Sequence, residues 1–279
     1  AESEADLFER GLIGVERSGW TMPQGVAPAY PELTGDLTTN VLVIGAGLAG
    51  SSLALHLAEA GVAVTVLEAR QPGWGASGRN AGHVLPILRD PGVFASFPDK
   101  GKAFLEAFRA HHTLPYDLQA QHGFDADAVR SGYLNVAADA DAIAKFRKQT
   151  AWMERQGLLS VAEIGGEDLH RATGSKIWDR ALNYVDGGRV NPYRLTNGMA
   201  AKAATLGARI YGQSPALTIA RSGARWTVRT AKGNVTADRV VFCTNAYPTG
   251  IVPEFATAFY PLTAYALTTK PLPADARAA

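Results

Sequence analysis

The sequence is short of cysteine: Cys243 is the only one among 279 residues. A single cysteine cannot form an intrachain disulfide or a cysteine-based metal cluster. The histidines also lack the paired spacing that metal sites use, so we expect no bound metal. These features agree with a reducing compartment, and we expect a cytoplasmic protein.

An excess of charge of one sign is lacking as well. The 27 Lys and Arg residues nearly balance the 26 Asp and Glu residues, which leaves a formal net charge of +1. Such a balance favours neither nucleic acid nor a charged membrane surface as a partner. The longest apolar runs, such as residues 41–44, are far shorter than the roughly 20 residues that span a bilayer. We therefore expect a small-molecule ligand, no nucleic acid and no transmembrane segment.

What the sequence does contain is a clear βαβ pattern near its beginning. Residues 41–44 form a short apolar run that is typical of a buried parallel strand. A glycine turn at 45–50 precedes a helix of small residues at 51–60, and Gly61 ends that helix. Residues 62–67 form the second strand-like run. This order predicts a dinucleotide-binding fold.

The rest of the chain adds helices and a set of strands. Amphipathic patterns predict helices over 102–118 and 139–156, with a strand at Tyr133–Ala137 between them. Asn191 predicts the start of a third helix, with Pro192 in its first turn. Four strand-like runs with glycine-containing turns follow, which predicts a β-meander that returns to a parallel strand. These runs are residues 208–211, 216–220, 226–230 and 239–243.

The glycine turn has the spacing of a phosphate-binding loop. Residues 41–50 read Val-Leu-Val-Ile-Gly-Ala-Gly-Leu-Ala-Gly. Gly45 permits the tight turn, Gly47 lets the backbone approach a pyrophosphate, and Gly50 lets the helix pack closely on the strand. The helix N-terminus at Leu48 and Ala49 then offers N–H groups and a partial positive charge to the anion.

Glu68 stands at the end of the second strand, about 20 residues after the turn begins. A carboxylate there can accept hydrogen bonds from both ribose hydroxyls, and it would repel a 2′-phosphate. The alternatives are an unliganded glycine-rich turn and a solvated strand-end carboxylate. The fingerprint alone does not separate NAD from FAD, because both dinucleotides use it.

Residues 73–84 read Gly-Trp-Gly-Ala-Ser-Gly-Arg-Asn-Ala-Gly-His-Val. This run resembles the flavin loop of the D-amino-acid oxidase/glycine oxidase (DAO) family of FAD-dependent enzymes, nearest to its gamma-glutamylputrescine oxidase-like branch. Residues 33–37, Leu-Thr-Gly-Asp-Leu, and 240–247, Val-Val-Phe-Cys-Thr-Asn-Ala-Tyr, resemble two further segments of that branch. The resemblance implies FAD as the cofactor.

The resemblance also implies contacts for individual residues. Residues 77–82 would present backbone amides to the pyrophosphate and the flavin ring, together with the side chains of Ser77 and Asn80. Arg70 would lie near the adenosine, and the main chain of Ala216 would pair with adenine. His83 would lie beside the reactive edge of the flavin and is the one candidate catalytic residue. Flavin contact, substrate orientation, tuning of the charge near the flavin and a merely structural role stay open for it. The residues expected to bind the cofactor are Gly45, Gly47, Leu48, Ala49, Gly50, Glu68, Ala69, Arg70, Ser77, Gly78, Arg79, Asn80, Ala81, Gly82, His83, Ala216, Thr244 and Asn245.

Two aromatic residues of these segments, Trp74 and Tyr247, are expected to serve packing rather than to gate a substrate. The glycines at 73, 75, 78 and 82 would let the backbone lie close to a flat ring even without the family resemblance. A flexible surface loop is the alternative for this segment.

The expected fold is α/β, with a Rossmann-type FAD-binding domain interleaved with part of a mixed-sheet substrate domain. We expect a leader at 1–38, an FAD-binding domain at 39–90 and 191–250, and a helical part of the substrate domain at 91–190. Residues 251–279 would form an incomplete substrate-domain strand, at 260–271, and a tail. Since nothing after residue 248 resembles the closing flavin segment of the family, we expect a missing C-terminal part or a second polypeptide that completes the fold.

The resemblance implies the oxidation of a C–N bond in an amine or amino acid. Hydride transfer to the flavin would give an imine that hydrolyses. An NAD-dependent dehydrogenase and a non-catalytic FAD-binding subunit of a hetero-oligomer are the alternatives. The identity of the amine, and oxygen or a quinone as electron acceptor, stay open.

Overall fold

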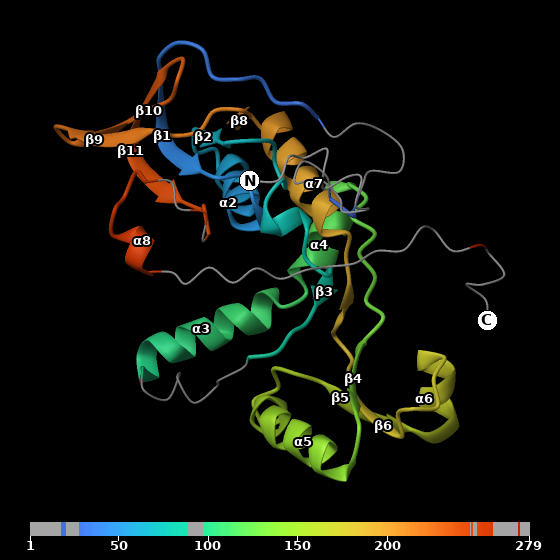
Figure 1. The fold of residues 1–279 in the computed structure, drawn as a ribbon. Coiled ribbons are helices and arrows are strands. Elements are labelled where there is room, and N and C mark those ends of the chain that lie inside the picture. The colour runs from blue at the N-terminus through green and yellow to red at the C-terminus, as the bar shows by residue number, and fades with distance from the viewer. Residues whose placement is uncertain are drawn as a thin grey trace. The chain divides into compact units, whose positions relative to one another are not determined.

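The computed structural model of the chain is α/β, as expected, and divides into two units that are described separately (Figure 1). Unit 1 consists of Ala1–Ala81, Phe124–Ala126 and Asn191–Thr268, and unit 2 of Gly82–Gly123, Asp127–Val190 and Thr269–Ala279. The structure describes residues 18–20, 28–88, 97–245, 247, 250–258 and 273. The expected strand at 260–271 therefore lies outside the described residues. The assignment of ranges to an FAD-binding and a substrate domain stays a prediction.

Unit 1 is built on a six-stranded sheet with the strand order β8-β2-β1-β11-β10-β9. Strand β1 pairs in parallel with β2 and β11, and β8 pairs in parallel with β2. Strands β9, β10 and β11 pair antiparallel, so the predicted meander returns to a parallel strand as expected. The strands are β1 Leu37–Ile44, β2 Val64–Leu67, β8 Arg209–Tyr211, β9 Thr218–Ser222, β10 Arg225–Arg229 and β11 Asn234–Phe242.

Two helices, α2 (Leu48–Glu59) and α7 (Pro192–Thr205), pack against each other in unit 1 (Figure 1). Helix α2 also contacts β1 and β2, and α7 contacts β8. Small buried residues, among them Ala54 and Ala200, allow the close helix approach. The Asn191 side chain accepts a hydrogen bond from the Arg194 N–H at 3.0 Å, which confirms the predicted start of α7.

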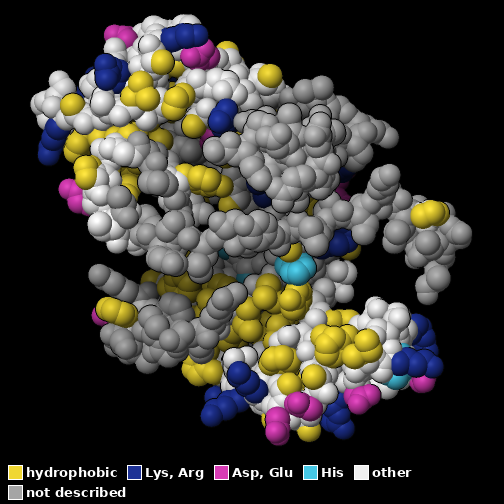
Figure 2. All heavy atoms as spheres, viewed as in Figure 1, with side chains coloured by type: hydrophobic (Ala, Val, Ile, Leu, Met, Phe, Trp, Pro, Cys, Tyr) yellow, Lys and Arg dark blue, Asp and Glu magenta, His cyan; other side chains and the backbone are white. Residues whose placement is uncertain are grey.

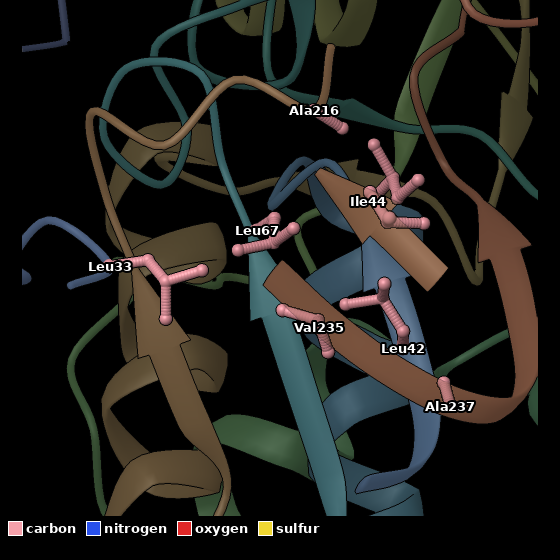
Figure 3. Close-up of a cluster of buried hydrophobic side chains, with 8 residues drawn as sticks. Leu33, Leu42, Ile44, Leu67, Ala216, Val235 and Ala237 are labelled. Carbon is pink, nitrogen blue, oxygen red and sulfur yellow. The ribbon is translucent and has the colours of Figure 1, made fainter. Parts of the chain in front are cut away.

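A cluster of buried apolar side chains joins the strands of unit 1 (Figure 3). It includes Leu42 and Ile44 of β1, Leu67 of β2 and Val235 of β11. Leu33 also belongs to it with 1% of its surface exposed. Strand β1 starts at Leu37, so the range predicted as a leader, 1–38, already contains residues of the sheet and the core.

Unit 2 contains a three-stranded antiparallel sheet in the order β4-β6-β5 and a short antiparallel pair, β3 with β7. Helix α5 packs on β4 and β6, and its Ile143 and Met153 share a buried cluster with Leu182 of β6. The predicted strand at Tyr133–Ala137 is confirmed as β4. The strands are β3 His83–Val84, β4 Tyr133–Ala137, β5 Val161–Gly165, β6 Arg180–Tyr184 and β7 Gly188–Arg189, and the helices are α3 Pro98–His111, α4 Leu114–His122, α5 Ala140–Arg155 and α6 Gly166–Thr173.

One predicted helix of unit 2 is wrong in its extent. The pattern over 102–118 predicts a single helix, whereas the chain forms α3 and α4 with Thr113 as the N-cap residue of α4. Pro115 explains the break, because in a continuous helix it would have no N–H to donate to the His111 carbonyl oxygen and its ring would clash with that carbonyl.

Basic and acidic side chains are interspersed over the described part of the face shown in Figure 2. Among the helices that the structure describes, none combines the length and the apolar character needed to cross a membrane.

We predict that Gly50→Ala destabilises the protein by about 1–3 kcal/mol, because a Cβ at this position needs space that the fold does not provide. A Cβ built on Gly50 would lie 1.9 Å from the Gly45 carbonyl oxygen. Urea unfolding measures the effect. Gly61→Ala is the control, since Gly61 has a left-handed φ of +71° but nothing within 4 Å of the added Cβ. A smaller loss in Gly50→Ala than in Gly61→Ala would contradict this reading of the turn.

Candidate functional site

A pocket of about 360 Å³ lies in unit 1 at the carboxyl ends of β1, β2 and β11. Ligands of open α/β sheets bind at this edge of the parallel strands. Four segments form its walls: residues 44–47, 67–77, 215–217 and the segment after β11 up to Tyr247. All four belong to unit 1.

The first wall is the glycine turn between β1 and α2. Gly45 has a φ of +100°, and a Cβ built on it would lie 2.7 Å from the Cys243 carbonyl oxygen. A Cβ on Gly47 would lie 2.7 Å from the Ser77 Oγ. Glycine at these two positions therefore lets the turn pack closely against the chain after β11 and against Ser77, and both glycines line the pocket.

Ser77 lies at the N-terminus of α2. Its Oγ accepts a hydrogen bond from the Leu48 N–H at 2.9 Å. A hydroxyl that accepts one hydrogen bond can still donate its own proton. Together with the positive end of the helix dipole, this hydroxyl makes the wall suitable for an anion.

Glu68 follows β2 and lines the pocket. Its Oε2 accepts the Ala46 N–H at 2.7 Å, and its Oε1 accepts the Arg70 N–H at 2.9 Å. The carboxylate thus holds the glycine turn and its own strand end in place. Each carboxylate oxygen has a further lone pair, so hydroxyl groups of a ligand can still donate to it.

The segment after β8 forms the apolar wall around Ala216. The Ser214 N–H donates to the Glu68 carbonyl oxygen at 2.8 Å, and the Gln213 N–H donates to the Arg70 carbonyl oxygen at 2.7 Å. These bonds hold the segment alongside the end of β2. Ala216 shares the buried cluster of Figure 3 with Ile44 and Leu67, and all three line the pocket. Their apolar surface suits a flat, uncharged ring system.

Nine of the residues expected to bind the cofactor line this pocket. They are Gly45, Gly47, Glu68, Ala69, Arg70, Ser77, Ala216, Thr244 and Asn245. The other nine do not line it: Leu48, Ala49, Gly50, Gly78, Arg79, Asn80, Ala81, Gly82 and His83. The binding role of each residue in both groups stays a prediction.

Contacts explain where several residues of the second group lie. The Asn80 Nδ2 donates to the carbonyl oxygens of Ser77 at 2.9 Å and Ala76 at 3.3 Å, so this side chain braces the loop. The Arg79 Nε donates to the Trp74 carbonyl oxygen at 2.6 Å. His83 belongs to unit 2, where its exposed ring forms a T-shaped contact with the ring of Tyr133, with 5.2 Å between ring centroids.

Sequence reasoning missed other residues that line the pocket. Trp74, Gly75 and Ala76 belong to the recognised loop and could have been included on that ground. Pro215 and Leu217 flank Ala216, and Ile44 and Leu67 end the two strands, so position alone indicated them. The lining residues outside the expected list are Ile44, Leu67, Gly73, Trp74, Gly75, Ala76, Pro215, Leu217, Cys243 and Tyr247. Of these, Gly73 and Gly75 were expected to lie close to a flat ring. Among the described residues, no group of three or more His, Cys, Asp or Glu side chains could hold a metal ion.

Comparison with known proteins identifies relatives of the chain. A family model described as DAO, FAD dependent oxidoreductase, matches residues 40–279. Gamma-glutamylputrescine oxidoreductase of Escherichia coli (strain K12) is 33% identical over 250 residues, which cover 88% of this chain and 58% of the relative. Human mitochondrial dimethylglycine dehydrogenase is 28% identical over 207 residues, which cover 72% of this chain and 22% of the relative.

A solved structure shows the same fold. Glycine oxidase from Bacillus cereus ATCC 14579 superposes with a TM-score of 0.61 at 25% identity, covering 77% of this chain and 58% of that one. The chain therefore spans less than two thirds of the length of these relatives.

Cys243 lines the pocket and gives a test of its occupancy. Burial raises the pKa of the Cys243 thiol. Because the thiolate is the reactive form, alkylation by iodoacetamide at neutral pH should be slower than that of a free thiol and should accelerate as the pH rises towards this raised pKa. Saturating FAD should slow the alkylation further. Cys243→Ser supplies the background, since the chain has no other cysteine. Equal rates with and without FAD would contradict an FAD molecule in this pocket.

Proposed function

The chain belongs to the DAO family of FAD-dependent oxidoreductases, and from this premise we propose that the pocket of unit 1 holds the ADP half of FAD. One observation supports the placement above all. The walls of the pocket follow the order of groups in an adenine dinucleotide: a bare glycine turn and a hydroxyl, then a carboxylate, then an apolar surface. These suit a pyrophosphate, a ribose and a base in turn.

Each chemical group in the ADP half of FAD has matching residues in the pocket. Gly47 lines the pocket beside Ser77, and the Ser77 hydroxyl donates its proton to the pyrophosphate at the N-terminus of α2. Glu68 accepts hydrogen bonds from the ribose hydroxyls and repels a 2′-phosphate. The main chain at Ala216 pairs with the adenine, and Arg70 lies beside the adenosine.

We further propose that the protein serves the oxidation of a C–N bond in an amine or amino acid. When bound, FAD supplies the hydride acceptor, and the substrate leaves as an imine that hydrolyses. The residues of this chain orient the cofactor and exclude water from it. Residues 77–82 supply backbone amides against the flavin ring, and His83 is the candidate for flavin contact, substrate orientation or tuning of the charge near the flavin. The names of the relatives support the substrate class, since gamma-glutamylputrescine, dimethylglycine and glycine are all amines or amino acids.

The E. coli relative is matched over 58% of its length, so its whole activity does not transfer to this chain alone. We propose that catalysis also needs the part of the relatives that the chain does not match, as a further segment or as a second polypeptide. We also propose a cytoplasmic location, which agrees with the single cysteine of the sequence.

Anaerobic addition of amines to the FAD-loaded protein tests the proposed activity. We expect amines or amino acids to bleach the visible flavin band, because the reduced ring absorbs less. A yellow protein that no compound of a broad amine panel bleaches, with or without a co-purifying polypeptide, would instead support a non-catalytic FAD-binding subunit. A protein that binds NAD and not FAD would support a dehydrogenase.

We predict that Glu68→Gln weakens FAD binding by about 1.5–3 kcal/mol, because the ribose hydroxyls lose a charged acceptor. The titration of apo-protein with FAD, followed by flavin fluorescence, measures the change. The control is Glu59→Gln, since Glu59 is exposed on α2 and contacts His56 outside the pocket. Equal affinities in Glu68→Gln and wild type would exclude Glu68 as the ribose ligand.

A further inference from the structure

Two aromatic side chains meet at the pocket from segments far apart in sequence. Trp74 lies in the loop after β2, and Tyr247 lies after the end of β11. Both line the pocket, and their ring centroids are 6.4 Å apart with the ring planes inclined by 57°. The pair therefore connects the wall formed by residues 67–77 to the wall formed by the segment after β11.

Tyr247 is fixed at two points to residues 73–78, the glycine-containing loop after β2 that we call the glycine loop. Its hydroxyl accepts a hydrogen bond from the Ala76 N–H at 3.0 Å. Its ring also lies so close to Gly75 that a Cβ built there would be 3.1 Å from a ring carbon. Tyr247 is 48% exposed, so the burial of its ring contributes little to the core. The hydrogen bond and the glycine contact place it at the pocket instead.

The hydrogen bond between Tyr247 and Ala76 is linked to the N-terminus of α2 by a single turn of the chain. Ala76 starts the short 3₁₀ turn η1 (Ala76–Gly78), and the next residue, Ser77, accepts the Leu48 N–H. Tyr247 thus holds the turn that sets the position of the Ser77 hydroxyl.

Trp74 is held by arginines of its own loop. The Arg79 guanidinium carbon lies 5.0 Å from the centroid of the Trp74 ring, and that of Arg70 lies 5.3 Å from it. These distances are within the range of cation–π contacts. The Trp74 ring is therefore a fixed surface for Tyr247 to meet.

We propose that Trp74 and Tyr247 form an aromatic clasp that positions Ser77 for the cofactor phosphate and slows the release of FAD. The identity of the ligand rests on the proposed function, whereas the clasp itself rests on the contacts above. Both are positioning residues, because they act through the glycine loop. A ligand stays in the pocket as long as Tyr247 keeps its contacts with Ala76 and Trp74.

The test is the rate of FAD dissociation from the holoprotein, followed by the recovery of flavin fluorescence after dilution. Tyr247→Phe removes one hydroxyl and keeps the ring. We expect it to raise the rate about threefold to tenfold, the effect of one hydrogen bond. Trp74→Leu removes the ring that Tyr247 meets and should raise the rate by at least as much.

The matched control for Trp74→Leu is Trp226→Leu. Trp226 lies on β10 and does not line the pocket. Like Trp74 it contacts an arginine, since the Arg221 guanidinium carbon lies 5.6 Å from the centroid of its ring. We expect wild-type dissociation from this variant. The melting temperature of each apo-protein gives a second readout, and Tyr247→Phe should lower it no more than Trp226→Leu does, while of these two variants only Tyr247→Phe raises the FAD dissociation rate.

The outcomes separate the clasp from the proposed function. A wild-type protein that holds FAD, with unchanged dissociation from Tyr247→Phe and Trp74→Leu, would overturn the clasp alone. Equal acceleration in Trp226→Leu would also overturn it, because the effect would then be general destabilisation. A wild-type protein that does not bind FAD would overturn the proposed function and the clasp with it.

Discussion

The close contact between the start of α2 and the end of β1 is the constraint on which the rest of unit 1 depends. A Cβ on Gly50 would lie 1.9 Å from the Gly45 carbonyl oxygen, so the helix can approach this closely only over a glycine. Three residues of the segment after β2 then hydrogen-bond to the same turn. Glu68 accepts the Ala46 N–H, the Gly73 N–H donates to the Ala46 carbonyl oxygen, and Ser77 accepts the Leu48 N–H. The turn therefore positions the wall of the pocket that directly follows β2, residues 67–77.

This arrangement places the binding groups before any ligand arrives. The carboxylate of Glu68 and the hydroxyl of Ser77 are each fixed by a backbone N–H, so neither has to be ordered when a ligand binds. Such preorganisation lowers the entropy cost of binding. It also gives the pocket a polar end at the helix and an apolar end at Ala216. A ligand with a charged middle and a flat base fits that polarity in one direction only.

The features that the sequence predicted well are local ones. The glycine spacing, the short apolar runs and the cap at Asn191 each occupy a few neighbouring residues, and β1, α2, β2 and α7 follow from them. Strands β5 and β6 were missed, because neither Val161–Gly165 nor Arg180–Tyr184 shows a regular apolar–polar alternation. Tyr247 was predicted to serve packing, since its place in the pocket depends on the long-range parallel pairing of β11 with β1. No pattern within a short window reports such a pairing.

The central claim is that the pocket recognises the adenosine and pyrophosphate of FAD, and calorimetric titration of the apo-protein tests it most directly. The account predicts that FAD binds, that ADP competes with it, and that FMN does not bind measurably, because FMN has neither the adenosine nor the second phosphate. FMN binding as tightly as FAD, or FAD binding that ADP does not weaken, would contradict the account.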